Sequence, residues 1–213
     1  MPPESYSGLL KLYLHHNPKW IMKMFPQLTW QKQVEEKILY ITFDDGPCPG
    51  VTDYVLDLLN QYHAKATFFC VGNNVLKYPE IYNSVLQKGH TTGNHTQHHL
   101  NGFVTNNTVY YNDIATAATA INSKLFRPPY GKIKPTQATH LLQHYNIIMW
   151  DFITGDFDPK LNIENCKKKM GKYIKAGSII VFHDSIKAEH NLKILLPYFL
   201  ERYSKEGYQF HSL

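Results

Sequence analysis

Hydrophobic runs with the composition of strands alternate along the chain with stretches whose apolar residues recur at helical spacing. Runs rich in β-branched and aromatic residues predict buried strands at residues 37–43, 65–71, 90–94, 146–151, 178–182 and 208–211, with a short strand leading into Arg127. Apolar positions three or four residues apart predict helices at residues 51–62, 108–124, 135–145, 163–174 and 190–203. A further helix begins near Pro79, which suits a first turn, and Gly89 can close it.

This alternation gives about seven strand–helix units, which implies a parallel sheet with right-handed crossovers. A chain of 213 residues is within the size range of a single α/β barrel. We find no internal repeat, low-complexity tract or interdomain linker. Residues before about Gln33 stand apart, and Trp20, Phe25 and Trp30 suggest that this segment packs as a helical cap.

Composition and charge exclude some classes of protein. A hydrophobic content of 43% is ample for a sizeable core, and the net charge of +5 is mild. The lysines at 167–169 fit a solvent-facing helix. No basic stretch is interleaved with aromatic residues, so no nucleic-acid partner is expected. The three cysteines, Cys48, Cys70 and Cys166, are widely spaced and imply no disulfide framework.

The N-terminal segment lacks the basic start and apolar core of a signal peptide. The apolar stretch at 9–14 is too short to cross a membrane, so no transmembrane segment is expected. As written, the chain therefore reads as a cytoplasmic protein, or as an extracytoplasmic one if a leader has been removed.

Two adjacent carboxylates, Asp44 and Asp45, follow the apolar strand at 37–43, and Gly46 and Pro47 then turn the chain. Like charges at a buried strand end disfavour joint ionisation. A cation or an arginine nearby would relieve this cost. The pair therefore indicates a functional site.

Two histidines downstream could supply the other ligands of a metal. His95 and His99 are four residues apart, so on a helical turn their imidazoles share one face. With Asp45 they make a two-histidine, one-carboxylate set, which is typical of a catalytic metal site with open positions. Spacing alone leaves a solvated histidine cluster open, because the chain has 12 histidines, and His98 could replace His99 as the ligand.

These segments resemble the polysaccharide deacetylases with a NodB homology domain, known as carbohydrate esterase family 4, which carry five ordered motifs. Three match in full: Thr-Phe-Asp-Asp-Gly-Pro at 42–47, His-Thr-Gln-His-His at 95–99 and Arg-Pro-Pro-Tyr-Gly at 127–131. The fourth is half present at 153–157, and the fifth is present at 181–183 with Val for Leu. The resemblance implies an N-terminal cap at 1–36, a NodB-like domain at 37–213 and a distorted (β/α) barrel with seven or eight parallel strands.

The resemblance also implies metal-assisted hydrolysis of an N-acetyl group. Asp45, His95 and His99 would hold one divalent ion, with zinc expected and cobalt, nickel or iron as alternatives for mixed nitrogen and oxygen ligands. Asp44 would be the general base, and Arg127 would pair with it and fix its orientation.

Three further residues complete the implied machinery. The backbone N–H of Tyr130 would stabilise the oxyanion, and His183 would protonate the leaving nitrogen. Asp156 would orient and charge His183, although Asp184 could compete for that role. Because an apolar strand precedes His183, a core histidine stays an alternative.

Two departures from the fourth motif concern the substrate pocket. Ile153 stands where the family has its first Asp, and Phe157 stands where the family has Trp. Phe157, Val181 and Pro129 are the expected substrate-contacting residues, with a smaller apolar wall than the family's Trp and Leu would give.

The leading hypothesis is a deacetylase of N-acetylglucosamine units in a chitin-like or peptidoglycan-derived glycan. A second hypothesis keeps the mechanism but takes a small non-polymeric amide. A third is a carbohydrate-binding module with weak catalysis, against which the intact Asp44–Asp45 pair and His183 argue.

Overall fold

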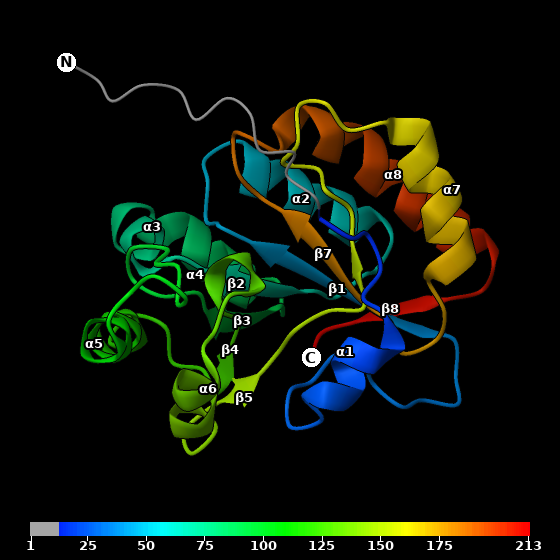
Figure 1. The fold of residues 1–213 in the computed structure, drawn as a ribbon. Helices are drawn as coiled ribbons and strands as arrows, with labels where there is room; N and C mark the ends of the chain where they lie inside the picture. The colour runs from blue at the N-terminus through cyan, green and yellow to red at the C-terminus, as the bar shows by residue number, and fades with distance from the viewer. Residues whose placement is uncertain (1–12) are drawn as a thin grey trace.

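A curled sheet of eight parallel strands runs through the computed structural model, which describes residues 13–213 (Figure 1). The strands are β1 (Ile38–Asp44), β2 (Thr67–Cys70), β3 (Thr91–Asn94), β4 (Leu125–Phe126), β5 (Asn146–Ile147), β6 (Phe152–Ile153), β7 (Ile179–His183) and β8 (Gln209–His211). The parallel sheet confirms the prediction from the strand–helix alternation, and its curled form is the distorted barrel that the family resemblance implies.

Strand β1 is the centre of the sheet. The order is β5-β4-β3-β2-β1-β7-β6, and β8 pairs with the first half of β1. In this register Asp44 lies opposite both Phe69 and His183. Because all strands run the same way, their carboxyl ends meet at one edge, and the residues that follow them converge there.

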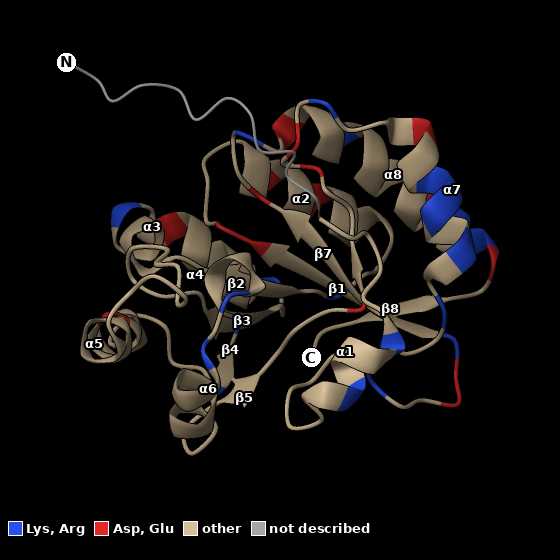
Figure 2. Ribbon diagram, viewed as in Figure 1, with Lys and Arg blue, Asp and Glu red and all other residues tan. Residues whose placement is uncertain are grey.

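Helices connect the strands and cover the sheet. They are α1 (Lys19–Met24), α2 (Val51–Gln61), α3 (Gly72–Lys77), α4 (Pro79–Gln87), α5 (Asn107–Ala118), α6 (Pro135–Leu141), α7 (Ile163–Tyr173) and α8 (Glu189–Lys205). Helices α7 and α8 lie side by side in Figure 1. Figure 2 shows lysines along the outer surface of α7, as the run at 167–169 predicts.

Burial follows the predicted periodicity. Strands β2 and β7 are buried at every position, and α2 buries Val51, Val55 and Leu59 on one face. Aromatic rings join the sheet to the helices, because the ring centroid of Phe182 on β7 lies 5.6 Å from that of Phe199 on α8, edge to face. The core under the site is therefore made of buried apolar side chains in mutual contact.

The described part of the segment before β1, residues 13–37, is mostly not helical. Within it α1 is the only α-helix, and Trp20 on this helix is 62% exposed, whereas Trp30 is buried. Outside α1, this part forms isolated bridges to the rest of the structure at His16, Thr29 and Gln31. The segment thus packs on the barrel through backbone pairing more than through a helical face. Residues 1–12 of the predicted cap lie outside the described part, and the boundary at residue 36 stays a prediction.

Three local predictions differ from the structure. The helix predicted at 108–124 ends at Ala118, and the strand predicted at 146–151 is only β5, which ends at Ile147, while β6 begins just beyond it at Phe152. Helix α3 was missed because Gly72-Asn73-Asn74 has the composition of a turn.

Within residues 13–213, none of the helices has the length and apolar content that spanning a bilayer demands.

Candidate active site

The functional side chains predicted from the sequence meet at the carboxyl edge of the sheet. Asp44 ends β1, His95 follows β3, Arg127 follows β4, Asp156 follows β6 and His183 ends β7. Of these, Asp44, His95 and His183 line a cavity of about 830 Å³, whereas Arg127 and Asp156 lie outside its lining. Its lining consists of Tyr13, Leu14, Asn17, Asp44, Asp45, His95, His99, Asn101, Tyr130, Lys132, Trp150, Ile153, Phe157, His183 and Lys187.

Asp45, His95 and His99 form a compact set of donor atoms inside this cavity. Nε2 of His99 lies 3.1 Å from Oδ1 of Asp45, and Nε2 of His95 lies 3.8 Å from the same oxygen. One ligand atom from each residue lies within 4.8 Å of the others. Two imidazole nitrogens and one carboxylate with open positions suit a catalytic transition-metal ion.

The histidines do not lie on a helical turn, so the helical part of the prediction is wrong. Residues 95–100 form a loop in which Thr96 and His99 have positive φ angles of 65° and 55°. Asp45 also has a positive φ, of 81°. Such conformations are uncommon outside glycine and cluster at functional sites, where the surroundings hold them in place.

Neighbouring groups fix how each histidine is oriented. Nδ1 of His95 lies 2.7 Å from the carbonyl oxygen of Arg127 and donates to it, which leaves Nε2 free to bind a metal. Nδ1 of His99 lies 3.1 Å from the hydroxyl of Tyr130. His98 instead pairs with Asp113 of α5 at 2.5 Å, so the geometry favours His99 over His98 as the ligand.

The protonation states agree with the donor set. Burial lowers the pKa of His95 to about 4, so this imidazole is neutral near pH 7. Burial alone would raise the pKa of Asp45, but the hydrogen bond from His99 and the charges of His183 and His95 lower it well below its usual range. Metal binding needs a neutral imidazole and an ionised carboxylate, and these residues supply both.

Arg127 is completely buried and forms an ion pair with Asp44. Its Nη1 donates to Oδ1 of Asp44 at 2.7 Å and to the hydroxyl of Thr42 at 2.6 Å. Its other nitrogens donate to the carbonyls of Ile148 and Met149. The guanidinium therefore relieves the like-charge cost of the Asp pair and fixes the Asp44 carboxylate at the cavity wall.

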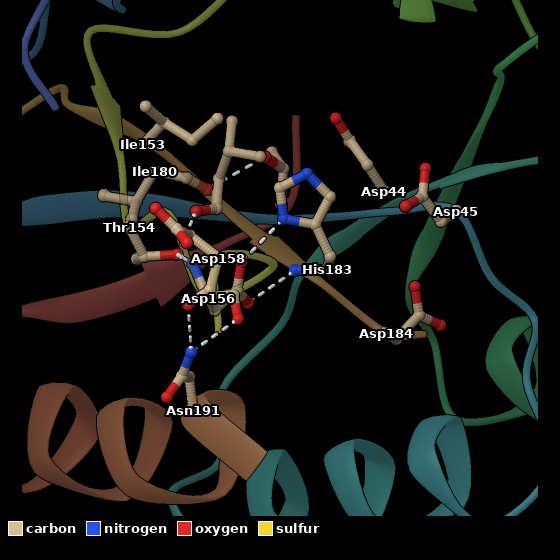
Figure 3. Close-up of polar contacts among 12 residues, drawn as sticks. Asp44, Asp45, Ile153, Thr154, Asp156, Asp158, Ile180, His183, Asp184 and Asn191 are labelled. Carbon is tan, nitrogen blue, oxygen red and sulfur yellow. Dashed lines mark hydrogen bonds and ion pairs between the residues drawn. The ribbon is translucent and has the colours of Figure 1, made fainter. Parts of the chain in front are cut away.

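Asp156 and His183 form a second charged pair on the other side of the cavity. Oδ1 of Asp156 lies 2.7 Å from Nδ1 of His183, and Oδ2 accepts the backbone N–H of the same residue at 2.8 Å. Figure 3 shows the imidazole between Asp156 and the Asp44–Asp45 pair. Burial would lower the pKa of His183, but Asp156 outweighs it and raises this pKa to about 9. The imidazole is therefore cationic and able to donate a proton at neutral pH.

Asp184 has a different task. It accepts the backbone N–H of Gly46 at 3.1 Å and the hydroxyl of Thr52 at 2.6 Å, and it lies apart from the Asp156–His183 pair in Figure 3. Burial raises the pKa of this carboxyl to about 8. Asp156 therefore contacts the imidazole of His183, whereas the side chain of Asp184 bonds Thr52 and the turn after β1.

The expected substrate-contacting residues divide into two groups. Phe157 lines the cavity, with its ring edge-on to His183 at 4.9 Å. Val181 and Pro129 are buried and lie outside the lining. Tyr130 lies at the rim, 61% exposed, with a positive φ of 60° that turns the chain after Pro129.

Sequence reasoning missed several lining residues. Tyr13, Leu14 and Asn17 come from the segment before α1, and no motif or periodicity marks them. Another missed lining residue is Lys187, whose Nζ lies 5.6 Å from the centroid of the Phe157 ring. Ile153 was noted as a departure from the family motif, and its place in the lining shows that this departure changes the cavity wall.

Comparison with known proteins gives the same family. The profile described as Polysaccharide deacetylase matches residues 31–149. A peptidoglycan-N-acetylglucosamine deacetylase of Bacillus cereus is 35% identical over 190 residues, which cover 86% of this chain and 89% of the relative. A chitooligosaccharide deacetylase of a Bradyrhizobium species is 30% identical over 68% of this chain and 70% of its own length.

Among solved structures, a peptidoglycan N-acetylglucosamine deacetylase in complex with 4-naphthalen-1-yl-N-oxidanyl-benzamide superposes with a TM-score of 0.83, at 28% identity, covering 92% of this chain and 95% of that one. The chain belongs to the polysaccharide deacetylase family, carbohydrate esterase family 4. Some relatives are much longer: the match spans 39% of the deacetylase PgdA of Listeria monocytogenes.

Proposed function

We propose that the protein is a metal-dependent hydrolase that removes N-acetyl groups from N-acetylglucosamine units of a glycan. The observation that carries this proposal is the placement of two charged pairs, Arg127–Asp44 and Asp156–His183, on either side of the Asp45–His95–His99 set in one cavity. A metal-dependent amide hydrolase can use such a set as base, acid and electrophile.

The chain's own residues would divide the work as follows. A divalent ion bound at Asp45, His95 and His99 would polarise the acetyl carbonyl and acidify a nearby water. Asp44, positioned by its hydrogen bond from Arg127, would take the proton of the attacking water.

The remaining steps concern the oxyanion and the leaving group. The backbone N–H of Tyr130 would donate to the developing oxyanion. His183 would give its proton to the amide nitrogen as the C–N bond breaks, while a C–O bond to the water oxygen forms. The products are acetate and the free amine of glucosamine, and the reaction consumes one water.

Several observations support a glycan as the substrate. Relatives from different bacteria are named as deacetylases of peptidoglycan and of chitooligosaccharides. Polar side chains at the cavity wall, among them Asn17, Asn101 and Lys132, can hydrogen-bond sugar hydroxyls. Zinc is the ion we propose, because two imidazoles and one carboxylate match its common catalytic ligand set.

The test is an acetate-release assay on chitooligosaccharides and on peptidoglycan-derived glycans, with and without a chelator. We expect release that stops on chelation and returns when zinc is added back. Activity on small N-acetyl amides but on neither glycan would favour the second hypothesis. Binding of glycans without acetate release from any substrate would favour a carbohydrate-binding module.

A further inference from the structure

A short extended segment, Tyr13–Asn17, lies along the edge strand β6, and we call it the strap. The backbone N–H of Ile153 donates to the carbonyl of His15 at 2.8 Å, and the N–H of Asn17 donates to the carbonyl of Asp151 at 3.0 Å. His16 forms an antiparallel bridge with Phe152. Since β6 ends the strand order of the sheet, the strap pairs with an otherwise open edge.

Side-chain contacts hold the strap in place in addition to the backbone hydrogen bonds. The buried His15 places Nδ1 at 2.9 Å from the carbonyl of Ile153, and the amide of Asn17 donates to the carbonyl of Trp150 at 2.7 Å. The ring of His16 stacks on Tyr173 of α7, with centroids 4.5 Å apart. These contacts fix the strap both to residues 150–153 and to helix α7.

The strap brings Tyr13 into the active-site wall. Its ring lies 5.2 Å from the ring of Phe157, which is itself edge-on to His183. Tyr13 also covers Gly155, because a Cβ added at Gly155 would lie 2.3 Å from the phenol ring. Gly155 also has a positive φ of 72°, so both its backbone conformation and the close approach of Tyr13 favour a glycine here. Tyr13, Phe157 and His183 thus form a continuous row of rings.

Tyr13 and Leu14 of the strap, together with Ile153 and Phe157, are apolar members of the cavity lining, and we call these four side chains the apolar side of the pocket. The rings of Tyr13 and Phe157 are in contact, whereas Asp44, Asp45, His95, His99 and His183 give the lining its charged and metal-binding groups. The alkyl part of an N-acyl group is the only apolar portion of the reacting amide. Burial of apolar surface is favourable, so the alkyl part belongs against these four side chains.

We propose that Tyr13 is a specificity-determining residue that closes the apolar side of the pocket and limits the acyl group to the size of acetyl. This inference rests on the proposed function, because it concerns the same hydrolysis. The ring blocks the space beyond Phe157, and the strap holds the ring there. Truncation of Tyr13 opens the wall to longer acyl chains.

The experiment compares kcat/KM on chitooligosaccharides that carry N-formyl, N-acetyl, N-propanoyl or N-butanoyl groups. One methylene in such a pocket changes kcat/KM by roughly 10–200-fold. We therefore expect Tyr13→Ala to raise the butanoyl-to-acetyl ratio by at least about tenfold. Tyr13→Phe keeps the ring and should keep the wild-type ratio. Tyr13→Trp enlarges the ring and should raise the formyl-to-acetyl ratio.

Trp20→Ala is the matched control, because Trp20 is an exposed aromatic residue of the same N-terminal segment outside the cavity lining. Circular dichroism and the melting temperature establish that each variant is folded. A folded Tyr13→Ala or Tyr13→Trp protein with wild-type ratios would overturn the inference. A wild-type protein that releases no acid from any of these substrates would overturn the proposed function itself.

Discussion

At the scale of single residues, the proposed function gives the neighbours Asp44 and Asp45 separate tasks, so their variants should fail differently. Asp45→Asn replaces the proposed carboxylate ligand, so the variant should lose bound metal together with activity. Asp44→Asn should keep the metal and lower kcat by about 10²–10⁴, the usual contribution of a general base. Elemental analysis alongside kcat measures both effects. A metal-free Asp44→Asn protein beside a metal-loaded Asp45→Asn protein would show that the roles are reversed.

Asp156 should control the pH range in which His183 acts. A general acid must be protonated, and Asp156 raises the pKa of His183 to about 9, so the wild-type acid is still protonated at pH 8. Asp156→Asn removes the charge and keeps the shape. The basic limb of the kcat/KM profile should then move to lower pH, and the rate at pH 8 should fall steeply.

The control for this prediction is Asp184→Asn, measured at saturating metal. Asp184 hydrogen-bonds Gly46 and Thr52, so its variant should leave the basic limb near the wild-type position. A limb that moves in Asp184→Asn and stays in place in Asp156→Asn would mean that Asp184 charges the imidazole.

At the scale of elements, Asp151 joins the strap, β6 and β7 through one buried residue. Its backbone carbonyl accepts the N–H of Asn17, and its Oδ2 accepts the hydroxyl of Ser178 at 2.8 Å. Oδ1 has no hydrogen-bond partner within residues 13–213. Burial raises the pKa of this carboxyl to about 7, so the folded protein binds a proton that the unfolded chain releases above about pH 4.

The unfolding free energy should therefore fall as pH rises between about 4 and 7, by up to about 1.4 kcal/mol per pH unit from this group. Above pH 7 both states are ionised and the contribution levels off. Asp151→Asn should remove this slope, since the amide cannot ionise. Urea unfolding at pH 5, 6 and 7 measures it, and Asp57→Asn on the exposed face of α2 is the control. Equal slopes in the wild type and Asp151→Asn would refute the assignment.

Element prediction succeeded where the pattern was long enough to read. Strand β1 has seven residues and helix α2 has 11, and the predicted ends of both lie within one residue of the observed ends. Strands β4, β5 and β6 have two residues each, which is too short for any periodicity to appear. Their position depends on pairing with distant neighbours, which local patterns do not report.

At the scale of the whole molecule, the alternation of strands and helices predicted the parallel sheet, and the family motifs predicted which strand ends meet. The strand order and the strap were not predictable. His15 and Ile153 are 138 residues apart in the chain, and no sequence pattern links them. Tyr13 therefore escaped notice, whereas Asp44, Arg127 and His183 did not, because their motifs carry the chemistry.

The loop with His95 and His99 is tethered to helix α5, and this has a consequence for how the ion enters. Asp113 accepts the backbone N–H groups of Gln97 at 2.8 Å and His98 at 3.0 Å. These bonds between protein groups hold the loop that carries His95 and His99. The side chains of these histidines therefore lose most of their conformational entropy when the chain folds, and little of that loss is left for metal binding. We therefore expect the empty protein to keep its architecture and to exchange its ion reversibly with solution, so that the supply of metals around it governs which one it carries.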